Sequence, residues 1–289
     1  MYDYKLLEAF ACVVETGGFE KAADKLCITQ SAVSQRIKQL EEQSMAVLLV
    51  RSNPPSPTEA GKAFIAHYNK VKLLESDVEA ELHAAEGPVS ICVGLNADTL
   101  ATWFFDAVAD TVMKNRIFLN LRVDDQEETH RLLKNGEAAG CVSTRSTPMQ
   151  GCSVTPLMTT TYRMFVSPEK KREFFPHGFT LDSIKEVPLI VYNSKDTLHL
   201  QLFEKVFGTR DIEYHAHYVP SVEKYLEAVT RGMGIGMMPH HQCDEPVNLG
   251  LIADAAYPYK VETRLFWHRW NIRSKPLDLI TKSLVDFCR

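Results

Sequence analysis

The sequence predicts an α/β protein that is preceded by an all-α N-terminal unit and a long helix. In the N-terminal part, apolar residues recur at helical spacing, with breaks at Gly17-Gly18 and Cys27–Thr29. Residues 58–86 contain no proline and only one glycine, Gly61, in the first turn. Beyond this helix, apolar segments alternate with polar helical stretches, which is typical of a largely parallel α/β sheet.

Residues 18–41 have the pattern of two short helices joined by a tight turn. Thr29 is placed to cap the second helix through its hydroxyl group, and Ala22-Ala23 would let the helices cross closely, as in a helix-turn-helix. An ordinary amphipathic helix pair fits the hydrophobic pattern equally well. The predicted buried faces consist of Phe19, Ala22, Ala23, Leu26, Val33, Ile37 and Leu40.

The outer face of the second helix carries hydrogen-bonding side chains and no carboxylate before Glu41. Such a face suits the major groove of double-stranded DNA, where short polar and amide side chains contact base edges. We predict that cations nearby hold phosphates. The predicted DNA-binding residues are Gln30, Ser31, Ser34 and Gln35 for bases and Lys38 and Arg51 for phosphates.

The length, composition and net charge limit the classes of protein to which this chain can belong. A chain of 289 residues, with 45% hydrophobic and 24% charged residues, suits two or three globular domains. No apolar run approaches the ~20 residues of a membrane span, and the N-terminus is no secretion signal, so we expect a cytoplasmic protein without a membrane partner. The net charge of −5 argues against nonspecific nucleic-acid binding, so DNA affinity would depend on local side-chain placement and on oligomers.

The predicted long helix, Thr58–Glu86, would span about 40 Å. It carries an apolar seam at heptad spacing, interrupted by Glu75. Dimerisation through this seam is one way to bury it, and packing along the following domain is the other. The seam consists of Phe64, Tyr68, Val71, Val78 and Leu82.

Small ligands of open α/β sheets bind beyond the carboxyl ends of the strands. Polar residues follow four of the predicted strands, and they would either cap the next helices or contact a ligand. We expect Asp98 or Thr99 to cap the helix after the first strand. The candidate effector-binding residues are Asn96, Asp98, Thr99, Asp124, Asp125, Ser143, Thr144, Asn193 and Asp196. The predicted strands are 89–95, 117–123, 138–143, 162–167, 188–192, 214–219, 234–238 and 263–267, and the last helix is 277–287.

The segment FEKAADKLCITQSAVSQRIKQLE closely resembles the N-terminal signature of LysR-type transcriptional regulators, and VLLVRSNPPSPTEAGKAF resembles their wing and linker helix. The resemblance implies a homodimer or homotetramer, with RNA polymerase as a further candidate partner. It implies two Rossmann-like lobes, as in periplasmic binding proteins, joined by crossings that we place near Thr159–Tyr162 and Trp267–Trp270. The implied domains are a winged helix-turn-helix at 1–57, a linker helix at 58–87, and an effector-binding domain at 88–289, with lobe I at about 88–160 and 268–289 and lobe II at about 161–267.

Two positions depart from the family pattern. The family usually has a glycine at the end of the recognition helix and a proline before the next apolar pair, where this chain has Met45 and Val47. We therefore expect a different turn after the helix. A strand at Val47–Val50 and a stiff loop at Asn53–Pro57 would form the wing.

Within the family, NADTLATWF, PHHQ and FWHRW resemble the subgroup that controls basic amino-acid export in response to lysine or arginine. A cationic effector needs a carboxylate partner, and its own carboxylate suits a helix N-terminus. Asp125 is our first candidate for that partner. Asp124, Asp98 and Asp196 follow.

Other functions remain as alternatives. The same architecture could sense another metabolite, a metal through His215, His217, His240, His241 and Cys243, or redox state through Cys141 and Cys152. A cytoplasmic solute-binding protein or enzyme is the alternative from another class, although neither would need the long helix. No nucleophile elbow, P-loop or dinucleotide fingerprint occurs, and the scattered cysteines predict reduced thiols. We predict no enzyme activity, no cofactor and no metal.

Overall fold

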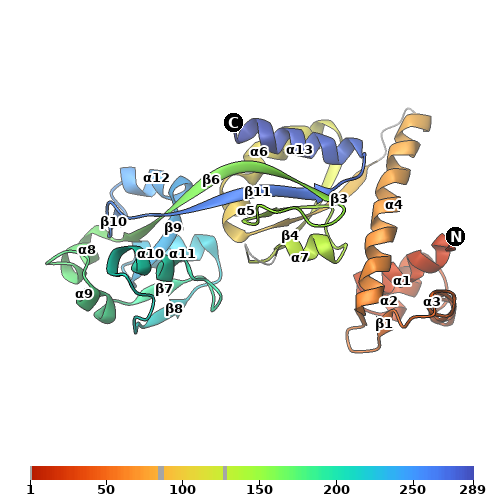
Figure 1. The fold of residues 1–289 in the computed structure, drawn as a ribbon, viewed down its shortest axis with the longest axis horizontal. Helices are drawn as coiled ribbons and strands as arrows, with labels where there is room; N and C mark the ends of the chain where they lie inside the picture. The colour runs from red at the N-terminus through yellow and green to blue at the C-terminus, as the bar shows by residue number, and fades with distance from the viewer. Residues whose placement is uncertain (1, 84–87, 126–128) are drawn as a thin grey trace.

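The computed structural model describes residues 2–83, 88–125 and 129–289 (Figure 1). Three helices form the N-terminal unit, and their predicted apolar faces meet in one core that includes Phe10, Val33 and Leu40. Gly17, in the left-handed conformation, ends the first helix, and the Thr29 hydroxyl accepts a hydrogen bond from the Ala32 amide at 3.2 Å. These helices are α1 (Tyr4–Thr16), α2 (Phe19–Leu26) and α3 (Gln30–Ser44).

Met45 closes α3 with the left-handed turn that glycine favours. Its φ is 51°, and its amide donates to the carbonyls of Glu41 and Glu42. The expectation of a different turn was therefore wrong. The Met45 and Val47 side chains are exposed, so neither packs into the core.

The wing is shorter than predicted, with β1 (Leu49–Val50) paired antiparallel to β2 (Ser56–Pro57). The Glu41 carboxylate accepts the amides of Leu48 (2.8 Å) and Leu49 (3.3 Å), which ties the start of the wing to α3. Ser56 and Pro57 belong to the second strand instead of the predicted loop.

Helix α4 (Glu59–His83) follows the wing, and the predicted remainder of the linker, residues 84–87, lies outside the described residues. Its middle packs against the effector-binding domain of the same chain. A Cβ on Gly136 would lie 2.2 Å from the Ala66 Cα, the Asn69 side-chain amide donates to the Gly136 carbonyl at 2.8 Å, and Leu73 is buried in the domain core. Packing along the following domain, one of the two alternatives, therefore accounts for one face of α4.

The predicted seam divides along the length of α4. Phe64 and Tyr68 pack partly against the N-terminal core. Farther along, the seam residues Val78 and Leu82 are exposed in the single chain. Leu74, which was not assigned to the seam, is exposed beside them.

The effector-binding domain is built on a sheet with the order β4-β3-β5-β11-β6-β9-β7-β8, and β10 pairs with β6. Strand pairs are parallel at both ends of the sheet, but β11 and β6 run antiparallel to their neighbours, so the sheet is mixed instead of largely parallel. The strands are β3 (Val89–Leu95), β4 (Ile117–Val123), β5 (Gly140–Ser143), β6 (Cys152–Val166), β7 (Leu189–Val191), β8 (Ala216–Tyr218), β9 (Ile235–Pro239), β10 (Ala253–Asp254) and β11 (Val261–Trp270).

The two long strands β6 and β11 run through both lobes, as the green and blue ribbons of Figure 1 show. They pair from Cys152 opposite Trp270 to Tyr162 opposite Val261, with an irregularity between Arg264 and Phe266. We predicted the return crossing near Trp267–Trp270, but residues 266–269 already pair with β5 in lobe I. The domain limits at residues 57 and 87 stay predictions.

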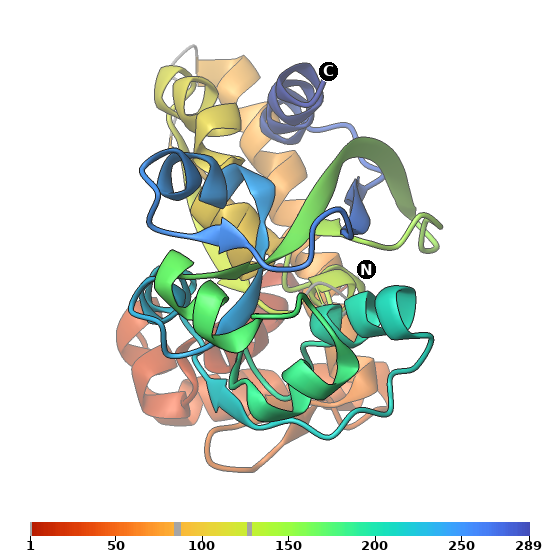
Figure 2. The ribbon, with the colours of Figure 1, turned by 90° about the vertical axis from the view of Figure 1, so that its left-hand side faces the viewer.

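Helices cover both faces of the sheet, and each lobe has its own core. Viewed from the lobe II end, lobe II lies in front and the N-terminal unit behind it (Figure 2). The helices of lobe I are α5 (Ala97–Thr102), α6 (Phe104–Lys114), α7 (Thr129–Lys134) and α13 (Lys275–Phe287). Those of lobe II are α8 (Pro168–Phe174), α9 (Leu181–Glu186), α10 (Leu198–Phe207), α11 (Val222–Thr230) and α12 (His240–Asn248).

Candidate functional site

The predicted DNA-binding residues lie on the outer face of α3 and beside the wing. Gln30, Ser31, Gln35, Lys38 and Arg51 are exposed, and Ser34 is half-buried. The Ser31 and Thr29 hydroxyls are 2.9 Å apart, at the start of the helix. The Lys38 ammonium lies 3.7 Å from Glu42, an exposed pair that is weak enough to yield to a phosphate. The base and phosphate assignments themselves stay predictions.

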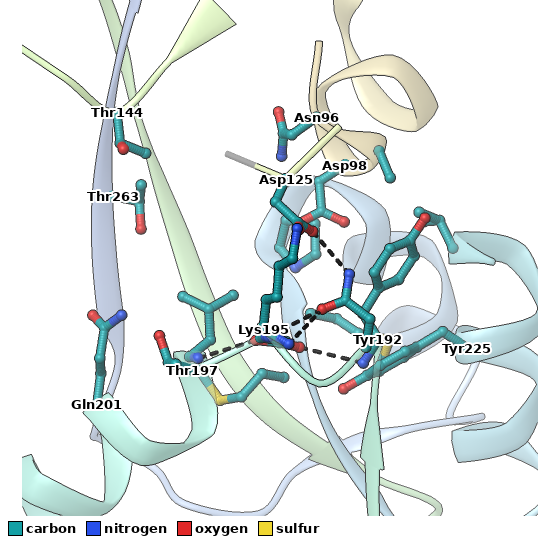
Figure 3. Close-up of a pocket in the computed structure, with 18 of the residues that line it drawn as sticks. Asn96, Asp98, Asp125, Thr144, Tyr192, Lys195, Thr197, Gln201, Tyr225 and Thr263 are labelled. Atoms are coloured by element: carbon teal, nitrogen blue, oxygen red, sulfur yellow. Dashed lines mark hydrogen bonds and ion pairs between the residues drawn. The ribbon is translucent and has the colours of Figure 1, made fainter. Parts of the chain in front are cut away.

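A cavity of about 610 Å³ lies between the two lobes (Figure 3). Its walls come from segments that follow the carboxyl ends of β3, β4, β5 and β7, together with the end of β9 and the crossing part of β11. This is the position at which open α/β sheets bind ligands. Seven of the nine candidate effector residues line it: Asn96, Asp98, Asp124, Asp125, Thr144, Asn193 and Asp196.

Two candidates do not line the cavity. Thr99 is buried within α5, and Asn96, not Asp98 or Thr99, occupies the N-cap position of that helix. Ser143 is buried at the end of β5, where its hydroxyl oxygen accepts the Arg145 amide at 3.3 Å. Both side chains are buried within lobe I and do not reach the cavity.

Asp125 joins the two lobes across the cavity. One of its carboxylate oxygens accepts the Asn193 side-chain amide at 2.8 Å, and the other lies 3.2 Å from the Lys195 ammonium. Asp125 belongs to lobe I, directly after β4, whereas Asn193 and Lys195 belong to the lobe II loop after β7. The first-ranked carboxylate is therefore in the cleft and has partners there.

Asp98 lies deeper in the same cleft, where the Tyr162 hydroxyl donates to its carboxylate at 2.8 Å. Burial raises the pKa of Asp98 to about 6, and the nearby negative charge of Asp196 contributes in the same direction, while the Tyr162 hydrogen bond opposes both. A cation placed beside Asp98 would favour its charged form. Asp98 is thus a second carboxylate of the cleft, and its pairing with a cation stays a prediction.

Asp196 and Asp124 mainly stabilise their own loops. The Asp196 carboxylate accepts the amides of Leu198 (3.0 Å) and Tyr192 (3.3 Å), and Asp124 accepts the Asp125 amide at 2.9 Å. Their charges still face the cavity. Both residues therefore stabilise local backbone and also line the cavity, while contact with a ligand stays a prediction.

Asn96 offers a buried acceptor in the cavity wall. Its side chain is 5% exposed, and its Oδ1 atom has no hydrogen-bond partner among the described residues. A buried acceptor without a partner is costly, so a ligand that donates a hydrogen bond would stabilise this position.

Sequence reasoning missed several polar wall residues, mostly from lobe II. Lys195 was not selected, although it stands between the candidates Asn193 and Asp196. The others follow no obvious motif. They are Tyr192, Thr197, Gln201, Tyr225, Gln242, Glu262, Thr263 and Arg264.

The redox and metal alternatives find little support in the geometry. Burial raises the pKa of Cys141 to about 12 and also raises that of Cys152, which disfavours the reactive thiolate form. All seven cysteines are free. Within the described ranges, no three His, Cys, Asp or Glu side chains cluster closely enough to hold a metal ion.

Among the helices within residues 2–83, 88–125 and 129–289, none combines the length and apolar character that a membrane span requires.

A helix-turn-helix with an exposed polar second helix, joined to a two-lobe domain with a polar cleft, defines a ligand-responsive DNA-binding regulator. Residues 4–62 match the family model of bacterial regulatory helix-turn-helix proteins of the lysR family, and residues 99–289 match the LysR substrate binding domain. The chain belongs to the LysR family of transcriptional regulators and is a regulator, not an enzyme. This confirms the fold class and the family predicted from the sequence.

Relatives extend the similarity over the whole chain. The HTH-type transcriptional regulator ArgP of Klebsiella pneumoniae is 35% identical over 99% of this chain and 96% of its own length. The crystal structure of ArgP from Mycobacterium tuberculosis has 35% identity and a TM-score of 0.89, covering 100% of this chain and 98% of that one. Full-length LysG from Corynebacterium glutamicum with bound effector Arg has 29% identity and a TM-score of 0.78, covering 99% and 98%.

Proposed function

We propose that this regulator binds a cationic amino acid, lysine or arginine, in the cleft between its lobes and thereby controls transcription in the cytoplasm. The observation that carries the proposal is the charge of the cavity wall, where five carboxylates face two cations. The arginine held by the related LysG supports the same ligand class. The carboxylates are Asp98, Asp124, Asp125, Asp196 and Glu262, and the cations are Lys195 and Arg264.

The arrangement suits each end of such a ligand. Asp125 and Asp98 would pair with the cationic side chain, because a desolvated positive charge needs a carboxylate partner. The free Asn96 oxygen would accept from the α-ammonium group. On the other side of the cavity in Figure 3, hydroxyl and amide groups face the α-carboxylate, which needs hydrogen-bond donors. These groups belong to Thr144, Thr197, Gln201 and Thr263.

Calorimetric titration of the full chain tests the proposal. We expect L-arginine and L-lysine to bind and L-citrulline, a neutral analogue of arginine with nearly the same shape, to bind at least about tenfold more weakly, because it leaves a carboxylate without a cation. Equal binding of arginine and citrulline, or no binding of either cation, would contradict the proposal.

The affinity for arginine should depend on pH through Asp98. Below a pKa of about 6 the carboxyl group is neutral and attracts no cation, so affinity should fall as the pH is lowered from 7 to 5. Titrations at several pH values check this. The Asp98→Asn variant should bind more weakly at pH 7 and lose this pH step. An unchanged step in that variant would assign the titration to another group.

The exposed face of α3 supports DNA recognition by this unit, and two substitutions separate its predicted roles. Gln30→Ala should reduce the preference for the operator over random DNA by about 1–3 kcal/mol, because a base contact is lost. Lys38→Ala should weaken binding to both DNAs alike, because a phosphate contact carries no sequence information. Fluorescence anisotropy with both DNAs distinguishes these results. Equal losses on both DNAs for Gln30→Ala would refute the assignment.

A further inference from the structure

The carboxylate that is best placed for a cationic ligand already holds a cation of the same chain. Figure 3 shows the Lys195 side chain extended from the lobe II loop to Asp125. Its ammonium group lies 3.2 Å from one Asp125 oxygen, while Asn193 donates to the other at 2.8 Å. Both oxygens of Asp125 are thus engaged by lobe II in this structure.

The Lys195 contact is the replaceable one of the two. The Lys195 side chain is 65% exposed and that of Asp125 is 26% exposed, and a pair in such a position contributes little stability. A long lysine side chain can also turn out into water without moving its backbone. The backbone itself is fixed, since the Lys195 amide donates to Asn193 Oδ1 at 2.8 Å and the Asp196 amide donates to the same oxygen at 3.1 Å.

We propose that Lys195 is an internal counterion of Asp125, which a cationic ligand must displace in order to bind. The inference rests on the proposed function, because it concerns the same cleft. A lysine or arginine side chain would replace one positive charge with another at the same carboxylate oxygen, and Asn193 would keep its hydrogen bond to Asp125.

Displacement has a consequence for selectivity. A neutral ligand cannot replace the Lys195 ammonium without leaving Asp125 short of positive charge, so it competes poorly with the internal pair. A cationic ligand replaces the Lys195 ammonium with another positive charge, so the exchange costs little free energy. Lys195 therefore reduces the affinity for every ligand at this carboxylate, and it reduces it most for neutral ones.

Titration of full-length variants with L-arginine tests the competition. Lys195→Met keeps most of the length of the side chain without its charge. This variant should bind arginine roughly two- to fivefold more tightly than the wild type, which corresponds to the strength of an exposed ion pair. Lys195→Arg, which keeps the charge, should bind within about twofold of the wild type. Equal or weaker binding by Lys195→Met would overturn the proposal, and weaker binding would indicate that Lys195 contacts the ligand itself.

Lys185→Met is the matched control. Lys185 lies on α9 in an exposed pair with Asp182, at 3.8 Å, and it does not line the cavity. Its replacement removes the same charge from lobe II, so any general electrostatic effect on arginine binding appears in this variant too. An equal gain in affinity for Lys185→Met would overturn the specific role of Lys195.

A second measurement needs no ligand. The melting temperatures of Asp125→Asn, Lys195→Met and the double variant form a cycle, and the two single shifts should not add if the pair exists in solution. Additive shifts would overturn the proposal whatever the titrations give. Failure of the wild type to bind any cationic amino acid would instead contradict the proposed function, so the two failures are distinguishable.

Discussion

Replacing Asp125 with asparagine is expected to lower the affinity for lysine and arginine by at least roughly thirtyfold, equal to about 2 kcal/mol. The substitution leaves the shape of the cleft and the hydrogen bond from Asn193 largely in place, but it removes the charge that pairs with the ligand's cation. The value is at the low end for such a loss because Asp125 is partly exposed. Calorimetric titration with both amino acids measures it.

Operator binding without effector should remain unchanged in the Asp125→Asn variant, because the DNA-binding unit lies beyond α4 from the cleft (Figure 1). Glu213→Gln provides a control, since it removes a carboxylate of lobe II that does not line the cavity. Wild-type affinity for arginine in the Asp125→Asn variant would mean that the ligand pairs with another carboxylate, with Asp98 and Asp196 next in order.

Replacing Leu74 and Val78 together with glutamate should convert a dimer into monomers. Both side chains are exposed in the single chain, Val78 by 54%, so the charges are harmless to the monomer but would be buried against a second α4. Val71, which we assigned to the seam together with Val78, is half-buried within the chain, so the exposed Leu74 is more suitable for this test. Sedimentation velocity gives the oligomeric state.

Lys72→Glu controls for the added negative charge on the same helix, because Lys72 is exposed but lies outside the apolar seam. This variant should stay oligomeric. A Leu74→Glu, Val78→Glu double variant that remains dimeric would show that α4 does not form the interface and that its apolar residues serve another contact.

Local patterns predicted the N-terminal unit closely because its helices are specified by short-range chemistry. Gly17 and Thr29 act at the helix ends expected from the sequence. The N-terminal part of β6 was missed because Pro156 and the polar run Thr159–Thr161 interrupt the alternation of apolar and polar residues. Its partner β11 supplies the pairing that holds it extended. Such pairing between distant segments leaves no local signal.

Only part of the cleft could be predicted from the sequence, for the same reason. The carboxylates after β3 and β4 could be found from the rule that ligands bind at the ends of parallel strands. The pairing of Asp125 with Lys195 could not, because it joins loops of two lobes that are far apart in the sequence. Ser143 was predicted to contact the effector but is buried, since a polar residue at a strand end can equally turn into the protein interior.

The close contact between Ala66 and Gly136 limits how a ligand signal can travel. No side chain fits between these two residues, and Lys70 lies over the Trp270 ring only one helical turn away, so α4 and lobe I should behave as one rigid body. If the cleft closes on its ligand, we expect lobe I to stay with α4 while lobe II moves and the β6–β11 ribbon, which joins the lobes, bends. Such a movement would not push the DNA-binding unit of the same chain directly. We therefore expect the response to depend on contacts between subunits, which would make the assembly, and not the single chain, the unit of response.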